Sequence, residues 1–128
     1  MRMWLVLAGI NGAMAVAAGA YASHGLAEAG PQAERWMQLA STYQLVHAVG
    51  LVALAAATPA LRATGRAGAR VLGVAAGLLF QAGIVMFCGA LYGLALDAWA
   101  VSGMAPAGGF AFIAGWLALS AAGITARQ

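Results

Sequence analysis

The sequence predicts an all-α membrane protein, one integral membrane domain over residues 1–128, built as a bundle of four transmembrane helices with both termini cytoplasmic. Hydrophobic residues make up 64% of the chain and charged residues only 7%, whereas soluble domains carry roughly 25% charged residues. Four apolar stretches contain no charged residue and can each cross a bilayer, at about residues 3–22, 39–60, 71–96 and 106–126. Polar and apolar residues do not alternate in them, which favours helices over barrel strands.

The composition also excludes several classes of protein. A mean hydropathy of +0.89 leaves too little charge to cover a water-facing surface. An ordinary cytosolic enzyme, a disordered protein and a nucleic-acid binder are therefore excluded. The net charge of +3 comes from Arg residues without any Lys, and the single Cys, Cys88, cannot form an internal disulfide.

The first stretch, 3–22, follows Arg2 and ends near Ala20-Tyr21-Ala22. This arrangement also resembles a signal peptide with its cleavage site, but we expect the segment to remain as the first span.

The second helix is expected to begin near Pro31, because Gly30-Pro31 suits a helix start, and to project beyond the bilayer. Aromatic residues are expected at the membrane boundaries, with Trp4 on the inner side and, on the outer side, Tyr21, Trp36, Tyr92 and Trp99.

The charged residues predict the orientation of the four spans. In a four-span chain, five arginines fall on one side, namely Arg2, Arg62, Arg66, Arg70 and Arg127. The other side receives Glu28, Glu34, Arg35 and Asp97. The positive-inside rule makes the arginine-rich side cytoplasmic, so both termini are expected inside. We also expect Arg62, Arg66 and Arg70 to contact anionic lipid headgroups.

Small residues in the spans predict close helix packing, because lipid provides no hydrophobic drive between helices. The first span carries a seam at alternating spacings of four and three, formed by Ala8, Gly12, Ala15, Gly19 and Ala22. Further glycines fall in the third and fourth spans. The residues expected to pack between helices are Gly12, Gly19, Gly77, Gly83 and Gly115.

Polar side chains inside the spans predict two interior clusters. Asn11, Gln81 and Trp116 all reach a depth near the midplane and could form one network that fixes helix register. Nearer the outer side, a second cluster is expected from His24, Tyr43, Gln44 and His47. The last three share a face of the second helix by their spacing. We expect the two imidazoles within about 10 Å of each other, either holding helices in register or lining a cavity open to the outside.

Neither a metal nor a cofactor is expected. Two histidines could begin a metal or haem site, but no third ligand lies near them in the sequence and no CxxCH or HExxH pattern occurs. No nucleophile–base pair or phosphate-binding loop is recognisable either. Whether the protein is an enzyme stays open, with the sequence favouring a non-enzymatic role.

Several motifs resemble one known family along nearly the whole chain. They are Gly19 to Leu26 (GAYASHGL), Tyr43-Gln44 with His47, Phe87 to Tyr92 (FCGALY), Pro106 to Gly109 (PAGG) and Gly115-Trp116. Together they resemble the domain-of-unknown-function 423 family, YgdD-like bacterial membrane proteins similar to animal transmembrane protein 256. Cys88 and Ala90 stand where the family motif has serines. The resemblance implies a multi-pass protein of the bacterial inner (plasma) membrane, and it implies no activity.

Three functions therefore remain open. The first is a non-enzymatic scaffold or accessory subunit that packs beside a larger membrane complex. The second is a small transporter or channel that uses His24, Gln44 and His47 at an outer cavity. The third is an enzyme or redox carrier that acts on lipid or quinone. The expected partners are membrane lipids and either a larger membrane complex or further copies of the same chain, with no nucleic acid.

Overall fold

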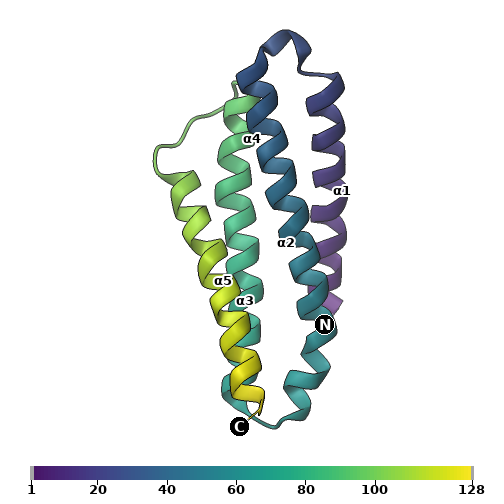
Figure 1. Ribbon diagram of the computed structural model, residues 1–128, viewed down its shortest axis with the longest axis vertical. Helices are drawn as coiled ribbons and strands as arrows, with labels where there is room; N and C mark the ends of the chain where they lie inside the picture. Colours follow the sequence, from purple (N-terminus) through teal and green to yellow (C-terminus); the bar gives the residue numbers. More distant parts are fainter. Residues whose placement is uncertain (1, 128) are drawn as a thin grey trace.

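In a computed structural model, which describes residues 2–127, the chain forms four long helical spans (Figure 1). Helix α1 covers Arg2–His24, and a short 3-10 helix, η1 (Ala27–Ala29), leads to α2 (Pro31–Ala63). The third span consists of α3 (Ala67–Gly83), a π-helical segment η2 (Ile84–Cys88) and α4 (Gly89–Ala95), and α5 (Met104–Arg127) is the fourth. Within residues 2–127, all four spans are long and apolar enough to cross a membrane, as the sequence predicts.

The second span begins where Gly30-Pro31 predicts. Gly30 has φ 96°, a conformation that glycine adopts readily, and Pro31 is the first residue of α2. With 33 residues, α2 is about 50 Å long, far more than the roughly 30 Å hydrocarbon core. It therefore extends past the bilayer, and the observed helices are longer than the expected apolar stretches except that the third ends at Ala95.

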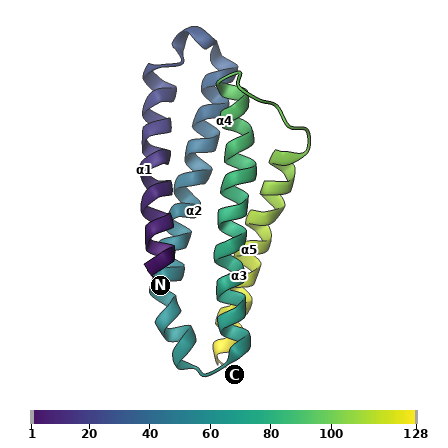
Figure 2. The same cartoon turned by 180° about the vertical axis from the view of Figure 1, so that it is seen from behind.

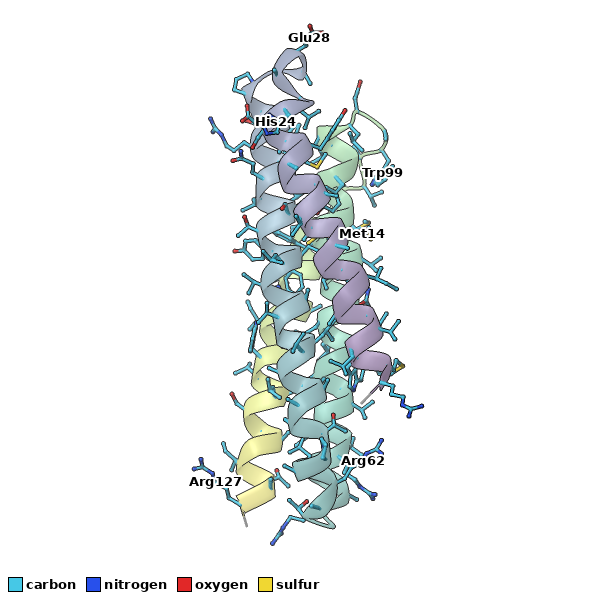
Figure 3. All side chains as sticks on the ribbon, turned by 90° about the vertical axis from the view of Figure 1, so that its right-hand side faces the viewer. Met14, His24, Glu28, Arg62, Trp99 and Arg127 are labelled. Carbon is cyan, nitrogen blue, oxygen red and sulfur yellow. The ribbon has the colours of Figure 1, made fainter. Side chains whose placement is uncertain are left out.

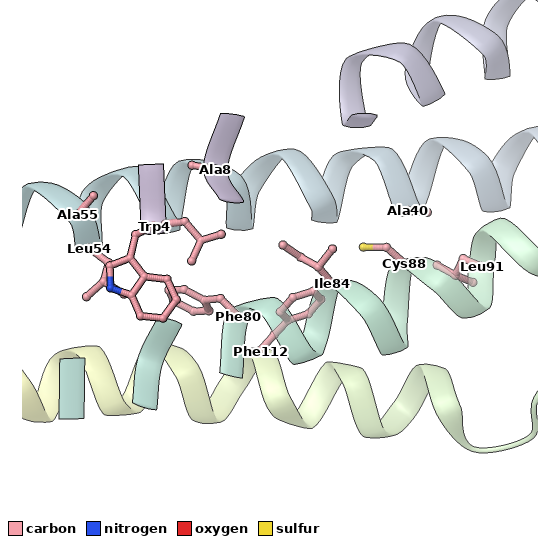
Figure 4. Close-up of a cluster of buried hydrophobic side chains, with 11 residues drawn as sticks. Trp4, Ala8, Ala40, Leu54, Ala55, Phe80, Ile84, Cys88, Leu91 and Phe112 are labelled. Atoms are coloured by element: carbon pink, nitrogen blue, oxygen red, sulfur yellow. The ribbon is translucent and has the colours of Figure 1, made fainter. Parts of the chain in front are cut away.

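The four spans are arranged around a central pair. Helix α2 and the third span lie side by side, with α1 against α2 on one edge and α5 against α3 on the other (Figures 1 and 2). Large buried side chains fill the space between the central helices, among them Leu54, Phe80, Ile84 and Phe112 (Figure 4). Helices α1 and α5 thus occupy opposite edges of the arrangement.

The charged residues separate along the long axis of the molecule. Figure 3 shows His24 and Glu28 at one end, and Arg62 and Arg127 at the other. This is the distribution that four antiparallel spans impose on the sequence. Which end faces the cytoplasm stays a prediction from the positive-inside rule.

Four of the five glycines expected at helix contacts lie against another helix. A Cβ added at any of them would come within 3.0 Å of a side chain, with Gly19 facing Ser41, Gly77 facing Trp4, Gly83 facing Phe112 and Gly115 facing Phe80. These positions accept only glycine without a shift of the neighbouring side chain.

The expectation for Gly12 is wrong. No atom lies within 4 Å of a Cβ built there. The buried face of α1 runs instead through Ala8, Asn11 and Ala15. Each residue turns the helix by 100°, so Gly12 points to the margin of this face and not into the contact with α2. Asn11 takes the buried place because its polar side chain has partners in the interior.

Candidate functional site

A chain of hydrogen bonds between polar side chains connects three spans. The Tyr92 hydroxyl donates to Gln44 Oε1 at 2.5 Å, and Gln44 Nε2 donates to Asn11 Oδ1 at 3.0 Å. Asn11 Nδ2 in turn donates to Gln81 Oε1 at 3.0 Å and to the Leu7 carbonyl oxygen at 2.8 Å. We call Asn11, Gln44, Gln81 and Tyr92 the amide network. Their bonds tie α1, α2 and the third span together.

The amide network lies along a groove between α1 and the third span. The groove has a volume of about 490 Å³, and its remaining walls are mainly apolar, including Ile10, Met14, Ile84 and Val85. Two of these wall residues, Ile84 and Val85, belong to η2. A π-helical turn within a membrane helix is uncommon and frequently marks a functional site. The groove therefore combines an apolar cleft, a polar lining and an irregular backbone.

The Gln81 side chain has hydrogen-bonding capacity left over. Its oxygen accepts from Asn11, but its amide nitrogen donates to no residue among those the structure describes. The side chain is only partly buried and lines the groove. The groove thus offers a donor at the depth of the amide network.

His47 lies on α2 with only 3% of its surface exposed. Its Nδ1 is 2.7 Å from the Tyr43 carbonyl oxygen, and its Nε2 is 3.1 Å from Trp116 Nε1. A carbonyl oxygen can only accept and an indole N–H can only donate. The proton therefore lies on Nδ1, and Nε2 accepts from Trp116. Both ring nitrogens of a neutral imidazole are satisfied by this arrangement.

Aromatic rings surround His47 on the side of α5. The imidazole stacks on Phe112 with a centroid distance of 3.6 Å and meets the edge of Phe80 at 5.4 Å. Tyr43, one turn earlier on α2, stacks at 6.2 Å from it. A second groove of about 490 Å³ opens here between α2 and α5. Since His47 has no free ring nitrogen, its contacts hold α2 and α5 together.

The structure divides the two expected clusters differently. Trp116 does not join Asn11 and Gln81, because α5 lies on the opposite edge from α1, and its indole bonds His47 instead. Gln44 does not join His47 but belongs to the amide network. Helix α2 is central, so side chains three residues apart on it reach different neighbours. Of the expected outer cluster, only Tyr43 and His47 lie together.

His24 is far from His47, contrary to the expectation of about 10 Å. Helix α2 runs antiparallel to α1, with Ser41 bonded to the Ala15 carbonyl and Gln44 bonded to Asn11. This register places His47 level with about residue 8 of α1, so that the two imidazoles are separated by about 24 Å along the axis. The expected distance counted the depth of His47 only from the charge-free stretch of α2, although the helix starts two turns earlier, at Pro31.

Tyr92 and Trp4 were expected at the membrane boundary, but the structure places both side chains in the interior. Tyr92 is half-buried and bonds Gln44 in the interior. Trp4 is only 4% exposed and packs over Gly77. The need of a buried Tyr hydroxyl or Trp N–H for a partner is the signal that could have drawn attention to them.

The remaining expected residues lie at the arginine-rich end. Arg62 and Arg70 line a pocket of about 280 Å³, together with Trp4, Thr58 and Gly73. Arg66 is exposed and does not line it. Among residues 2–127, no group of three or more His, Cys, Asp or Glu side chains gathers as metal ligands would.

Comparison with known proteins gives consistent matches. The family model described as "Protein of unknown function (DUF423)" matches residues 18–109. The chain is 36% identical to the UPF0382 membrane protein SERP0230 of Staphylococcus epidermidis, over 93% of both chains. It is 34% identical to the UPF0382 membrane protein YwdK of Bacillus subtilis, over 97% of this chain and 98% of that one.

The chain is also similar to the UPF0382 inner membrane protein YgdD of Escherichia coli, with 32% identity over 90% of this chain and 84% of the relative. No solved structure matches it. The four apolar spans and these relatives agree on a small multi-pass membrane protein of unknown function. The chain belongs to the DUF423 family.

Proposed function

We propose that the protein is a non-enzymatic scaffold or accessory subunit that packs beside a larger membrane complex through the outer face of α1. The observation that carries this proposal is a second set of small residues on that helix. Opposite the buried face of α1 lie four exposed small residues, Gly9, Ala13, Ala17 and Ala20. Their spacing of four, four and three residues keeps them on one stripe.

Internal packing does not account for this stripe. No atom lies within 4 Å of a Cβ built at Gly9. Glycine within a helix costs roughly 0.5–1 kcal/mol relative to alanine, and lipid tails gain nothing from its small size. A second helix does gain, because small residues let two backbones approach closely in a membrane. The stripe therefore has the composition of a helix–helix contact without a partner inside the molecule.

The reactive side chains are already engaged in the fold, which supports a non-enzymatic role. Both ring nitrogens of His47 are bonded. The Cys88 thiol is buried with 1% exposure. Asn11 and Gln44 form bonds that join helices. These groups contribute to helix association more directly than to chemistry on a substrate.

Site-specific photo-cross-linking in native membranes tests the proposal. A photoreactive residue at Ala13 is expected to form an adduct with another polypeptide, which mass spectrometry then identifies. The same residue at Val71, which is 65% exposed on α3, is the control and is expected to label lipid only. Equal protein labelling from both positions, or none from Ala13, would argue against a partner on this face.

A substitution separates association from folding. Ala13→Leu fills the stripe with a large side chain. In this variant, a photoreactive residue placed at Ala17 is expected to form no adduct with another polypeptide. Because Ala13 is exposed, the melting temperature in detergent should remain unchanged. Persistence of the adduct in a folded Ala13→Leu protein would contradict close helix packing at the stripe.

A second candidate function is the binding of a lipid-soluble molecule in the groove beside the amide network. It is favoured by the π-helical segment in the groove wall and by the donor that Gln81 offers. A mainly apolar cleft with a few directed polar groups is typical of a small-molecule site. The ligand would carry a hydrogen-bond acceptor on an apolar body.

Mass spectrometry of organic extracts from the purified protein tests this candidate. Val85→Trp would fill the groove, whereas Val71→Trp places the same ring on an exposed position of α3 that does not line it. A co-purifying compound that Val85→Trp loses and Val71→Trp retains would support the candidate. Identical extracts from both variants would contradict it.

A further inference from the structure

The pocket at the arginine-rich end contains a set of hydrogen-bond donors. We call it the arginine pocket, with Trp4, Thr58, Arg62, Arg70 and Gly73 among its walls and a volume of about 280 Å³. It lies between the end of α2 and the start of α3, below the first turn of α1. Figure 3 shows Arg62 beyond the point where α1 begins, on the same end as Arg127.

The unequal lengths of the helices create this pocket. Helix α1 begins at Arg2, whereas α2 continues to Ala63, so the last turns of α2 have no cover from α1. Trp4 closes the pocket on the side of the membrane interior, with its ring against Gly77. Gly73 contributes no side chain, and a Cβ there would come within 3.0 Å of Leu61. The unequal helix lengths and the glycine at position 73 therefore both contribute to the space.

The indole N–H of Trp4 has no partner among residues 2–127, although the ring as a whole is buried. The side chain is 4% exposed, and its nitrogen bonds no residue within 2–127. In this range no fully enclosed side-chain nitrogen or oxygen lacks a partner, so the Trp4 nitrogen must reach open space. Figure 4 shows the nitrogen on the edge of the ring that faces Leu54, toward the arginine-rich end. Trp4 lines the arginine pocket, and we take this pocket to be the open space that the N–H reaches.

The charge of the arginine pocket is not compensated by acidic side chains. All three acidic residues of the chain belong to the opposite end, because Glu28 precedes α2, Glu34 lies in its first turn and Asp97 follows α4. Arg62 and Arg70 make no ion pair within the described residues. Two guanidinium groups and an indole N–H can only donate hydrogen bonds. An occupant of this pocket must therefore be an acceptor and, for two cations, an anion.

Thr58 adds a group of the opposite kind. Its hydroxyl donates to the Leu54 carbonyl oxygen at 2.8 Å, so its oxygen is left as an acceptor for a ligand hydroxyl. A phosphodiester with a hydroxylated headgroup matches this combination. Arg is well suited to such a phosphate because its planar guanidinium can bond two oxygens at once.

We infer that the arginine pocket binds the phosphodiester of an anionic phospholipid from the leaflet at this end of the molecule. The pocket lies where the apolar spans give way to the arginine-rich loop, which is the depth of lipid headgroups. Arg62 and Arg70 hold the phosphate from two helices, and Trp4 donates to it from the membrane side. Bound lipid would fasten the uncovered end of α2 to α3.

Native mass spectrometry of the detergent-purified chain tests the inference, with phosphatidylglycerol and phosphatidylcholine as probes. Phosphatidylglycerol is expected to be retained more strongly. Arg62→Gln and Arg70→Gln should each weaken its retention about fivefold, from the roughly 1 kcal/mol that an arginine contributes at an anionic surface. Arg66→Gln removes the same charge from the same loop outside the pocket and should change retention by less than about twofold, because its charge attracts the phosphate only from a distance, where salt screens it.

Trp4→Phe is the most specific variant, because it keeps an aromatic ring at this position and removes the N–H. We expect retention of phosphatidylglycerol to weaken at least tenfold, since a hydrogen bond to a charged group contributes roughly 1.5–3 kcal/mol. Equal losses from Arg62→Gln and Arg66→Gln would overturn the pocket as the site. Equal retention of the two lipids would overturn its selectivity for anions. Competition by inorganic phosphate at equal concentration would show that free phosphate, and not lipid, is the occupant.

Discussion

At the scale of single residues, the polar side chains inside the membrane are used in pairs and chains. Gln44 has the central place, because it accepts from Tyr92 and donates to Asn11. Removing it leaves the Tyr92 hydroxyl and the Asn11 carbonyl oxygen without these partners. An unsatisfied group in an apolar interior loses more free energy than an average hydrogen bond contributes.

Gln44→Leu should therefore destabilise the folded protein by about 1–3 kcal/mol. The substitution keeps the approximate volume and removes both hydrogen bonds. Thermal unfolding in detergent measures the effect. Gln38→Leu, at an exposed position of the same helix, makes the same chemical change and should leave the melting temperature nearly unaltered. A Gln44→Leu protein as stable as the parent would show that the amide network contributes little to the fold.

Two glycines, Gly77 on α3 and Gly12 on α1, differ in how much space surrounds them. Gly77→Ala puts a Cβ against the ring of Trp4, and the resulting overpacking should cost about 1–3 kcal/mol. Gly12→Ala enters open space and should be neutral or stabilising by about 0.5–1 kcal/mol through helix propensity. Comparing the two melting temperatures checks this prediction. The reverse order would mean that α1 contacts α2 through the Gly12 face.

At the scale of elements, the third span is the irregular one. Its π-helical segment Ile84–Cys88 contains one residue more than a regular turn would need. The irregularity brings Tyr92 of α4 to Gln44 while Gln81 of α3 faces Asn11. Helix α3 before the segment and helix α4 after it therefore both direct their polar residues toward the interior, despite the extra residue between them.

Deleting Val85 should consequently be tolerated better than deleting Val74. Val85 is an exposed residue of η2, and its removal can convert the π-helical turn into a regular one. Val74 is exposed within the regular helix α3, and its removal rotates all following residues by about 100°. We expect a monodisperse, cooperatively unfolding protein from the first deletion and misfolding from the second. Gel filtration and thermal unfolding in detergent distinguish them, and equal damage would contradict the interpretation of η2 as an inserted residue.

At the scale of the whole molecule, the four spans place the three acidic residues at one end and five of the six arginines at the other. Labelling of single cysteines in intact cells, in a Cys88→Ala background, tests the orientation. Cysteines at Arg66 and Arg127 should be protected from an impermeant reagent, and cysteines at Glu28 and Asp97 should react with it. Labelling of Arg66 and Arg127 from opposite sides would exclude the four-span topology, whereas uniform reversal would overturn only the cytoplasmic assignment.

Local sequence was enough to predict the number of spans, their approximate limits, the start of α2 at Pro31 and the distribution of charge between the two ends. These properties depend on local composition, because about 20 apolar residues must cross the hydrocarbon whatever their neighbours are. The close approaches at Gly77, Gly83 and Gly115 also follow from small residues in membrane helices. Family membership was also predictable, because the motifs that indicate it are short and local in the sequence.

Asn11 and Gln81 meet as their similar depths predict, but the other polar partners follow from the tertiary structure alone. Gln44 and His47 are three residues apart, yet one bonds Asn11 on α1 and the other bonds Trp116 on α5. Their partners depend on the rotation and axial register of each helix, which are set by contacts summed over several spans. His24 lies apart from His47 because α1 and α2 are aligned by the Ser41 and Gln44 bonds, and the arginine pocket exists because α1 starts short of the end of α2. Hydropathy and spacing along one helix contain no information on these relations between helices.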